Sequence, residues 1–129
     1  MANAHMSAVV GPDGTRLQLS ISPDGPLIVR VCRADPEADD GWAGVMVRIV
    51  PAPEAATFLQ AMANVEPIGY EGEQLRLAFA RQPEGWAISV ARRTPPENEF
   101  NIVRYYPVSG VRAGEIAYHL LAAITRSTT

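Results

Sequence analysis

The sequence is poor in the residues on which most catalytic and metal sites depend. It has one cysteine, Cys32, so an internal disulfide is excluded and no group of thiolates is available for zinc. Its two histidines are His5, in a segment that we expect to be a cloning remnant, and His119. The sequence shows no nucleophile and base at recognisable spacing, no glycine-rich phosphate loop and no cluster of metal ligands. We therefore expect a protein that is not an enzyme and that uses no metal or other cofactor.

Long apolar runs and lysine are missing as well. No apolar stretch approaches the length of a membrane span, and no basic region followed by an apolar stretch opens the chain, so we expect a soluble, cytoplasmic protein. The formal net charge is −3 and the isoelectric point is near 5.3, which argues against a generally basic nucleic-acid-binding protein. All Lys and Arg positions are arginine, so binding of an anionic partner must depend on where the arginines lie.

The strongest internal signal is a hairpin that is present twice. Residues 16–33, RLQLSISPDGPLIVRVCR, align with residues 76–93, RLAFARQPEGWAISVARR. The alignment matches Pro23-Asp24-Gly25 with Pro83-Glu84-Gly85, Arg16 with Arg76, Leu17 with Leu77, Ile28 with Ile88 and Arg33 with Arg93. A repeat of this size indicates one supersecondary unit used twice.

The duplication extends beyond the hairpin on both sides. Downstream, the pattern V-R-x-x-P at residues 47–51 recurs at residues 103–107, and it matches Arg48 with Arg104. Upstream, residues 11–14 precede the first hairpin as residues 69–72 precede the second. With residues 1–6 set aside as the remnant, we predict one domain, residues 7–129, made of the repeats 7–65 and 66–126.

Apolar periodicity predicts four strands and one helix in each repeat. The expected strands lie near 7–10, 16–22, 27–33 and 42–50, then 65–70, 74–81, 86–93 and 100–106, with helices over about 53–64 and from about 109, and a loop at Pro95-Pro96. Strand 27–33 is apolar on both faces, which predicts a central position in its sheet. The fold class is α+β, with duplicated ββββα units, antiparallel sheets each followed by a helix, and pseudo-twofold packing.

The two hairpins disagree at one point. In the second hairpin Trp86, Ile88 and Val90 form the inner face, whereas the alignment places Arg30 where Val90 stands. A bulge or an asymmetric core could reconcile them.

Arginines that recur in register are the candidate binding residues. They are Arg16, Arg33, Arg48, Arg76, Arg93 and Arg104, with Tyr70 and Tyr105, and also Trp42 and Tyr106, as stacking platforms. Guanidinium groups pair with phosphate and stack on bases, and aromatic rings stack on bases, so the pattern favours a nucleic-acid-binding sheet face. The alternative is an ordinary solvated sheet face with its aromatic residues in the core.

The order of elements resembles the Whirly, PUR-repeat and PC4-like group of single-stranded nucleic-acid-binding proteins. The resemblance covers nearly the whole chain and lies in the topology, so it transfers no individual residue. It implies binding of single-stranded DNA or RNA across the sheet surfaces, and a homodimer or other homo-oligomer.

A protein-interaction module is the alternative function. An acidic adaptor, inhibitor or secretion-chaperone-like dimer that binds a protein partner and no nucleic acid would also suit the small size and low isoelectric point. The most acidic stretch, Asp35 to Asp40, does not have the ligand spacing of a calcium loop and is expected to be a solvated loop. No membrane partner is expected in either case.

Overall fold

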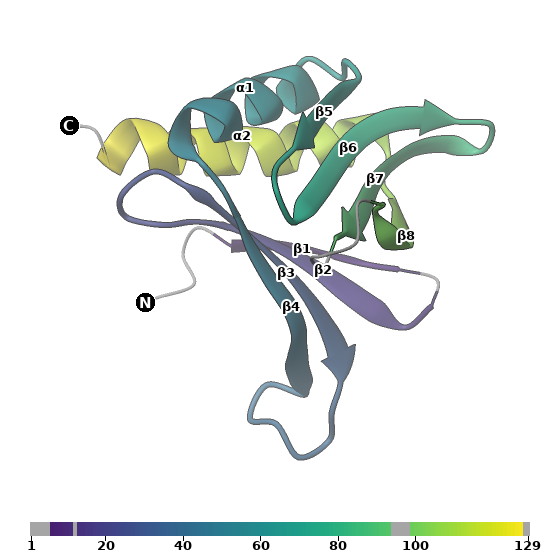
Figure 1. Ribbon diagram of the computed structural model, residues 1–129. Helices are drawn as coiled ribbons and strands as arrows, with labels where there is room; N and C mark the ends of the chain where they lie inside the picture. The colour runs from purple at the N-terminus through teal and green to yellow at the C-terminus, as the bar shows by residue number, and fades with distance from the viewer. Residues whose placement is uncertain (1–5, 12, 94–98, 128–129) are drawn as a thin grey trace.

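The computed structural model describes residues 6–11, 13–93 and 99–127, and it contains two four-stranded antiparallel sheets and two helices (Figure 1). The expected remnant falls on residues 1–5, outside this part of the chain, except for Met6, which begins the first strand. The loop expected at Pro95-Pro96 also lies outside it.

Each unit consists of four strands in sequential order followed by a helix. Sheet A contains β1 (Met6–Val10), β2 (Thr15–Ile21), β3 (Leu27–Ala34) and β4 (Trp42–Val50), and α1 (Ala52–Ala63) follows it. Sheet B contains β5 (Ile68–Glu71), β6 (Leu75–Gln82), β7 (Gly85–Arg92) and β8 (Asn101–Pro107), and α2 (Gly110–Ser127) follows it. The predicted α+β fold with two ββββα units is confirmed, and β3 has the central position predicted for it.

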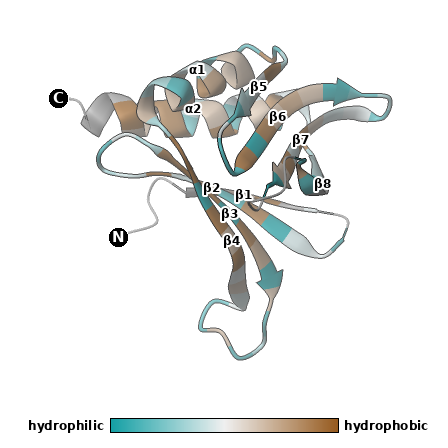
Figure 2. Cartoon of the chain, in the orientation of Figure 1, coloured by the Kyte–Doolittle hydropathy of each residue, from teal (hydrophilic) through white to brown (hydrophobic). Residues whose placement is uncertain are grey.

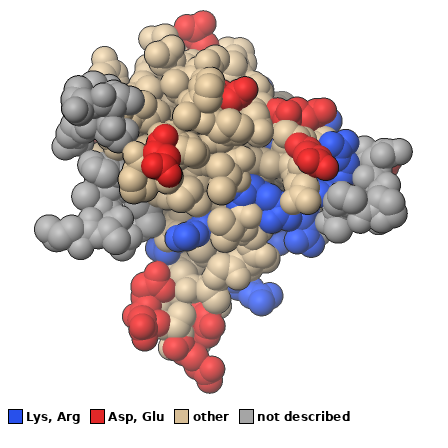
Figure 3. Space-filling model, turned by 60° about the vertical axis from the view of Figure 1, so that its left-hand side comes forward, with Lys and Arg blue, Asp and Glu red and all other residues tan. Residues whose placement is uncertain are grey.

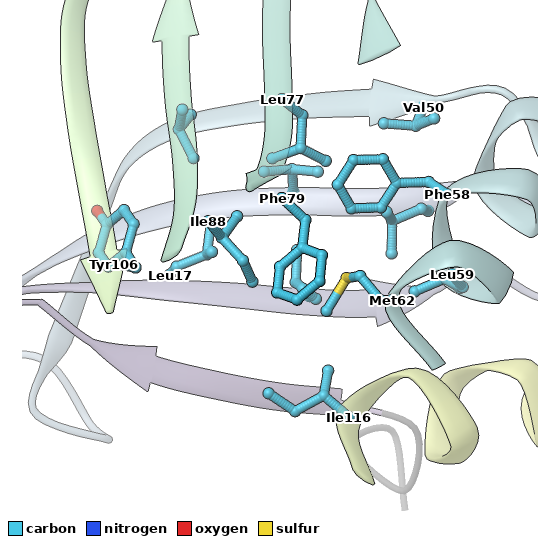
Figure 4. Packing of buried hydrophobic residues seen from close by; sticks show 14 of the residues in the cluster. Leu17, Val50, Phe58, Leu59, Met62, Leu77, Phe79, Ile88, Tyr106 and Ile116 are labelled. Atoms are coloured by element: carbon cyan, nitrogen blue, oxygen red, sulfur yellow. The ribbon is translucent and has the colours of Figure 1, made fainter. Parts of the chain in front are cut away.

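The core forms between the inner faces of the sheets and the two helices (Figures 2 and 4). The fully buried side chains come from both sheets and both helices, and the largest are Tyr106, Phe58, Phe79, Leu17, Leu19, Leu27, Leu59, Met62, Leu77, Ile88, Ile116 and Leu120. Strand alternation explains the pattern in β2 and β6, because every second residue points to the same face. One face of each sheet is thereby covered.

The helices use matching stripes to reach this core. The buried residues of α1 are Ala55, Phe58, Leu59 and Met62, and the buried positions in the first part of α2 are Ala113, Ile116, Ala117 and Leu120. Both sets have the i, i+3, i+4, i+7 spacing of one helix face. The helices pack against each other as well as on the sheets. Pro53 lies in the first turn of α1, where its missing N–H has no partner to lose.

The hairpin turn of sheet B is one residue shorter than that of sheet A. In sheet A the N–H of Ser22 donates to the carbonyl of Pro26, and residues 23–25 lie between them. In sheet B Gln82 pairs with Gly85, and only residues 83 and 84 lie between them.

This difference changes which residues of the returning strands are equivalent. Val31 of β3 lies opposite Leu17, and Val90 of β7 lies opposite Leu77. Val31 therefore matches Val90, and the expectation that Arg30 stands in the place of Val90 is wrong. The turn length resolves the disagreement between the hairpins, and no asymmetry of the core is needed.

The same shift corrects the match of the third arginine pair. Arg33 lies opposite Thr15, and Arg92 lies opposite Leu75. Arg33 therefore matches Arg92 and not Arg93. For the same reason, Ile88 matches Val29 and not Ile28.

The V-R-x-x-P match is also wrong, by two residues. Val29 pairs with Arg48, whereas its counterpart Ile88 pairs with Tyr106. Arg48 therefore has the position of the buried Tyr106. Arg104, paired with Val90, has the position of Met46, which pairs with Val31.

Two further features of the units do correspond. The ladder slips at Val31 in sheet A and at its counterpart Val90 in sheet B, so both units have an irregularity at the same place. Before the first hairpin, the N–H of Gly11 donates to the carbonyl of Thr15, the first residue of β2, as the N–H of Gly72 donates to that of Leu75, the first residue of β6. Gly69, which the alignment matched with Gly11, instead lies within β5.

Candidate functional site

An arginine stacks on an aromatic ring in sheet A, where β2 and β4 begin. Arg16 of β2 holds its guanidinium carbon 4.4 Å from the ring centroid of Trp42, the first residue of β4. The nearest carboxylate, that of Asp40, is 3.9 Å from the guanidinium. The Nε atom of Arg16 is buried and has no hydrogen-bond partner among the described residues. The guanidinium of Arg16 is therefore held in place over the Trp42 ring.

Sheet B has the same arrangement with a second arginine added. Arg76 of β6 lies 4.5 Å from the ring centroid of Phe100, and Arg93 lies 4.8 Å from it. Arg76 also forms an ion pair with Glu71, with nitrogen and oxygen 3.0 Å apart. The Nε of Arg93 donates to the carbonyl of Glu73. Both guanidinium groups are thus oriented by an acceptor on one side and a ring on the other.

These two arrangements occupy equivalent positions. Arg16 and Arg76 have the same place in β2 and β6, because Leu17 and Leu77 beside them match. The residue just after Trp42 pairs with Arg33, and the residue just after Phe100 pairs with Arg92, so the rings also match. We call the Arg16–Trp42 pair and the Arg76–Arg93–Phe100 group the arginine corners.

Other arginines lie along the seam between the two sheets. Arg92 and Arg104 line a small cleft there together with Val31, Val45, Met46 and Val90. Arg48 lies beside a second hollow, where its guanidinium donates to the Val47 carbonyl while its buried Nε has no acceptor in the described part of the chain. Figure 3 shows arginine side chains gathered across the middle of one face, with acidic side chains above and below them. Charge is therefore segregated on this face although the net charge is negative.

A hydrogen-bonded group joins the two sheets at Arg104. Its guanidinium donates to Asp13 over 2.7 Å, and Asp13 also accepts from the hydroxyl and the N–H of Thr15. The Thr15 hydroxyl lies 2.9 Å from the buried hydroxyl of Tyr106. The bonds from Thr15, with a smaller contribution from Arg104, lower the pKa of Asp13 below its ordinary value, whereas burial raises the pKa of Tyr106. We call these four residues the sheet clasp.

The predicted aromatic platforms divide into two kinds. Tyr105 is 53% exposed on the outer face of sheet B, and Trp42 is half-buried under Arg16. Tyr70 packs against the core, and Tyr106 is fully buried. The prediction that Tyr106 offers an open stacking surface is therefore wrong. Tyr70 also lies on the inner face of its strand, but it is only partly buried and lines the hollow beside Arg48.

The predicted arginines do not form one cluster. Arg16 and Arg76 belong to the two corners, Arg93 joins the second corner, and Arg48 and Arg104 lie at the seam. Arg33 is exposed at the end of β3. Three of them have acidic neighbours, namely Arg16, Arg76 and Arg104.

Sequence reasoning missed Phe100, Arg92 and Asp13. Trp42 is the first residue of β4 and Phe100 directly precedes β8, so a strand-by-strand alignment would have found the pair. Arg92 was hidden by the turn of unequal length. Asp13 had a local signal, because an Asp two residues before a Thr commonly accepts its N–H in a turn.

Within the described ranges, no three His, Cys, Asp or Glu side chains lie together as metal ligands. Among the same residues, neither helix combines the length and the apolar character that crossing a bilayer requires.

The fold is similar to a solved one. The chain resembles the crystal structures of Trypanosoma brucei MRP1/MRP2 with a TM-score of 0.68 and 15% sequence identity, over 95% of this chain and 84% of that chain. No protein-family model and no curated protein matches the sequence. At this identity the likeness shows the fold alone, so the two sheets with their helices form an architecture shared with MRP1/MRP2.

Proposed function

We propose that the protein binds single-stranded nucleic acid across the two arginine corners and the seam between them. The observation that supports this most is the repetition of the corners at equivalent positions of the two sheets. A side chain that only improves solubility has no reason to stack on a ring at the same place in both units. The topological resemblance to the Whirly, PUR-repeat and PC4-like group supports the same class of ligand.

The corners combine two kinds of contact that a single strand requires. A guanidinium fixed over a ring presents its N–H groups in one plane, which suits the oxygens of a phosphate. Tyr105, exposed on sheet B, offers a ring on which a base can stack. In this proposal the two units lie about a pseudo-twofold axis, and one strand runs from one corner across the seam to the other.

Fluorescence anisotropy with labelled oligo(dT) and oligo(rU) tests the proposal. Binding at low salt should weaken steeply as salt rises, with a logarithmic slope of about −0.7 per phosphate contacted. The double variant R16A/R76A should bind at least tenfold more weakly. Arg112, exposed on α2 away from the sheets, provides the control R112A, which removes one positive charge and should leave the affinity nearly unchanged. Absence of binding by the unaltered chain at low salt would refute the proposal.

The acidic neighbours of the corners give a test in the opposite direction. The carboxylates of Asp40 and Glu71 pair with Arg16 and Arg76, so they would compete with a phosphate for these guanidinium groups. The variant D40N/E71Q should therefore bind more tightly than the unaltered chain. E115Q, at an exposed position on α2, controls for the change in net charge. D40N/E71Q removes two negative charges and E115Q removes one, so a gain in E115Q half as large as that in D40N/E71Q would show that only total charge matters.

A protein-interaction module is the second candidate. The loop between β3 and β4 projects from sheet A, and its acidic side chains Glu37, Asp39 and Asp40 are exposed (Figures 1 and 3). Such a loop suits a basic surface of another protein. The absorbance ratio at 260 and 280 nm of purified material distinguishes the two functions, since a high ratio indicates bound nucleic acid and a low ratio with a co-purifying polypeptide indicates a protein partner.

A further inference from the structure

The outer side of β4 carries an apolar row on a strand at the edge of its sheet. Val45, Val47 and Ile49 are 41%, 46% and 59% exposed, and β3 is the strand that pairs with β4 (Figures 1 and 2). Nine residues long, β4 contains no proline, and Arg48 is its only charged residue. An exposed, apolar edge strand of this length is a template for pairing with another strand.

The edge strands of sheet B are protected in ways that β4 is not. With only four residues, β5 is short and ends in Glu71. Pro107 ends β8, and its nitrogen cannot donate to a neighbouring strand. Short length, charge and proline are the usual protections of an edge. A bulge also protects an edge, and β4 has one at Val45, which lies between Met46, paired with Val31, and Gly44, paired with Cys32. From Met46 onward the strand is regular, so Val47 and Ile49 belong to its regular part.

We propose that β4 pairs antiparallel with β4 of a second copy of this chain, about a twofold axis at Val47. In this register Val47 faces itself, Val45 faces Ile49 of the second copy, and Met46 faces Arg48 of the second copy. The exposed row then meets only apolar side chains on its own face. A twofold contact must be complementary to itself, and this strand meets that requirement.

The charges around the strand allow the same contact. Arg30 is exposed on β3 and pairs with Val47, so each copy places one arginine next to the central row. The two Arg30 residues would be separated by three strand spacings, about 14 Å in total. That separation exceeds the Debye length of about 8–10 Å at moderate salt, so their repulsion is screened. Arg30 therefore does not prevent self-pairing, and the reason to name a second copy as the occupant is that the apolar row meets its own apolar residues in this register.

The pairing would join two copies of sheet A into one continuous sheet. The arginine corners and the apolar row involve different residues, but Val45 and Ile49 of the row also line the clefts at the seam. Association is therefore measured without nucleic acid, so a monomeric chain that still binds oligonucleotide would refute the pairing alone.

Cysteine cross-linking tests the register in the full chain. In a C32S background, V47C should form a disulfide-linked dimer on mild oxidation, since opposed residues of antiparallel strands have Cα atoms about 4.5–5.5 Å apart and a disulfide spans about 4.4–6.8 Å. V45C alone should not cross-link, because the two copies of residue 45 would be about 13 Å apart. Mixing V45C with I49C should give the mixed disulfide. V111C, on α2 and 77% exposed, is the control for random collision.

Light scattering provides an independent readout. The unaltered chain should show a mass near twice 13.9 kDa at micromolar concentration, and V47K should weaken the association at least tenfold. V111K introduces the same charge on α2 and should leave the mass unchanged. The proposal is overturned by a monomer at high micromolar concentration, by a V47K protein that still dimerises, or by V47C cross-linking no faster than V111C.

Discussion

Sheets A and B agree on the faces that they turn toward the core. Leu17 has its counterpart in Leu77, and the α1 stripe recurs in α2. Their outer faces have little in common. The outer face of sheet A carries Arg30 and the apolar row of β4. The outer face of sheet B consists mainly of small residues beside the exposed Tyr105, namely Gly69, Ala78, Ala80, Ala87, Ser89 and Ala91.

This difference shows which parts of the unit are required by packing. Inner positions are constrained by close-packed neighbours, so a workable set of side chains can serve both copies. Outer positions have no such constraint and can acquire separate uses. The arginine corners are therefore informative, because they lie at the ends of the sheets and still recur in both units.

The largest expected effect tests the agreement of the inner faces. L17A and L77A each truncate a fully buried leucine at the same ladder position, so each should lower the free energy of unfolding by about 2–5 kcal/mol. Urea unfolding followed by circular dichroism measures both. If the two losses of unfolding free energy differ by more than about 3 kcal/mol, the two inner faces are not equivalent in packing.

The sheet clasp is a point where the units differ, because Tyr106 has the position of Arg48. Y106F removes the hydroxyl beside Thr15 and should lower the free energy of unfolding by about 0.5–1.5 kcal/mol. Y105F removes the hydroxyl of the adjacent, exposed tyrosine and should have almost no effect. A Y106F protein as stable as Y105F would show that the bond contributes nothing measurable.

The two arginine corners should contribute unequally. W42L and F100L keep an apolar side chain but remove the ring, and each should lower stability by about 0.5–1 kcal/mol. The effect should be larger at Trp42, because the side chain of Arg16 is 17% exposed and that of Arg76 is 54% exposed. Double-mutant cycles with R16A and R76A measure the two coupling energies, and the reverse order would contradict the role of burial.

The smallest effect is the pH dependence due to Asp13. Its folded-state pKa lies below the unfolded value of about 3.8, so its contribution is full above that value and is lost as the pH falls through the folded pKa. The stability difference between the unaltered chain and D13N should therefore be constant near neutral pH and shrink below about pH 4. A difference that stays constant down to pH 2 would contradict this assignment.

The fold could be predicted to the level of its elements. Alternation in residues 16–22 and the helical stripe of Phe58, Leu59 and Met62 depend only on local periodicity, which the sequence displays directly. The register could not be predicted, because Pro23-Asp24-Gly25 and Pro83-Glu84-Gly85 look alike while closing turns of different length. A turn that is one residue shorter moves every match in the returning strand by one position.

The candidate site was predicted in part for the same reason. Arg16 and Arg76 were matched correctly because they precede the turn. The match of Arg33 with Arg93 was displaced by the turn. The match of Arg48 with Arg104 was displaced by two residues, because the V-R-x-x-P pattern falls at different ladder positions in β4 and β8. The rings that complete the corners come from the fourth strands, so the contact between Arg76 and Phe100 depends on the sheet pairing rather than on any local pattern.

The unequal turns also differ in what surrounds them. A side chain at Gly25 would meet Ala52 at 3.3 Å, so the tip of the first hairpin rests on the start of α1, whereas the space around Gly85 is open. Residues can therefore be added between Gln82 and Gly85 with little disturbance of the packed layers. A fluorophore or an affinity tag could therefore be inserted at the tip of the second hairpin without contacting the helices or the other sheet.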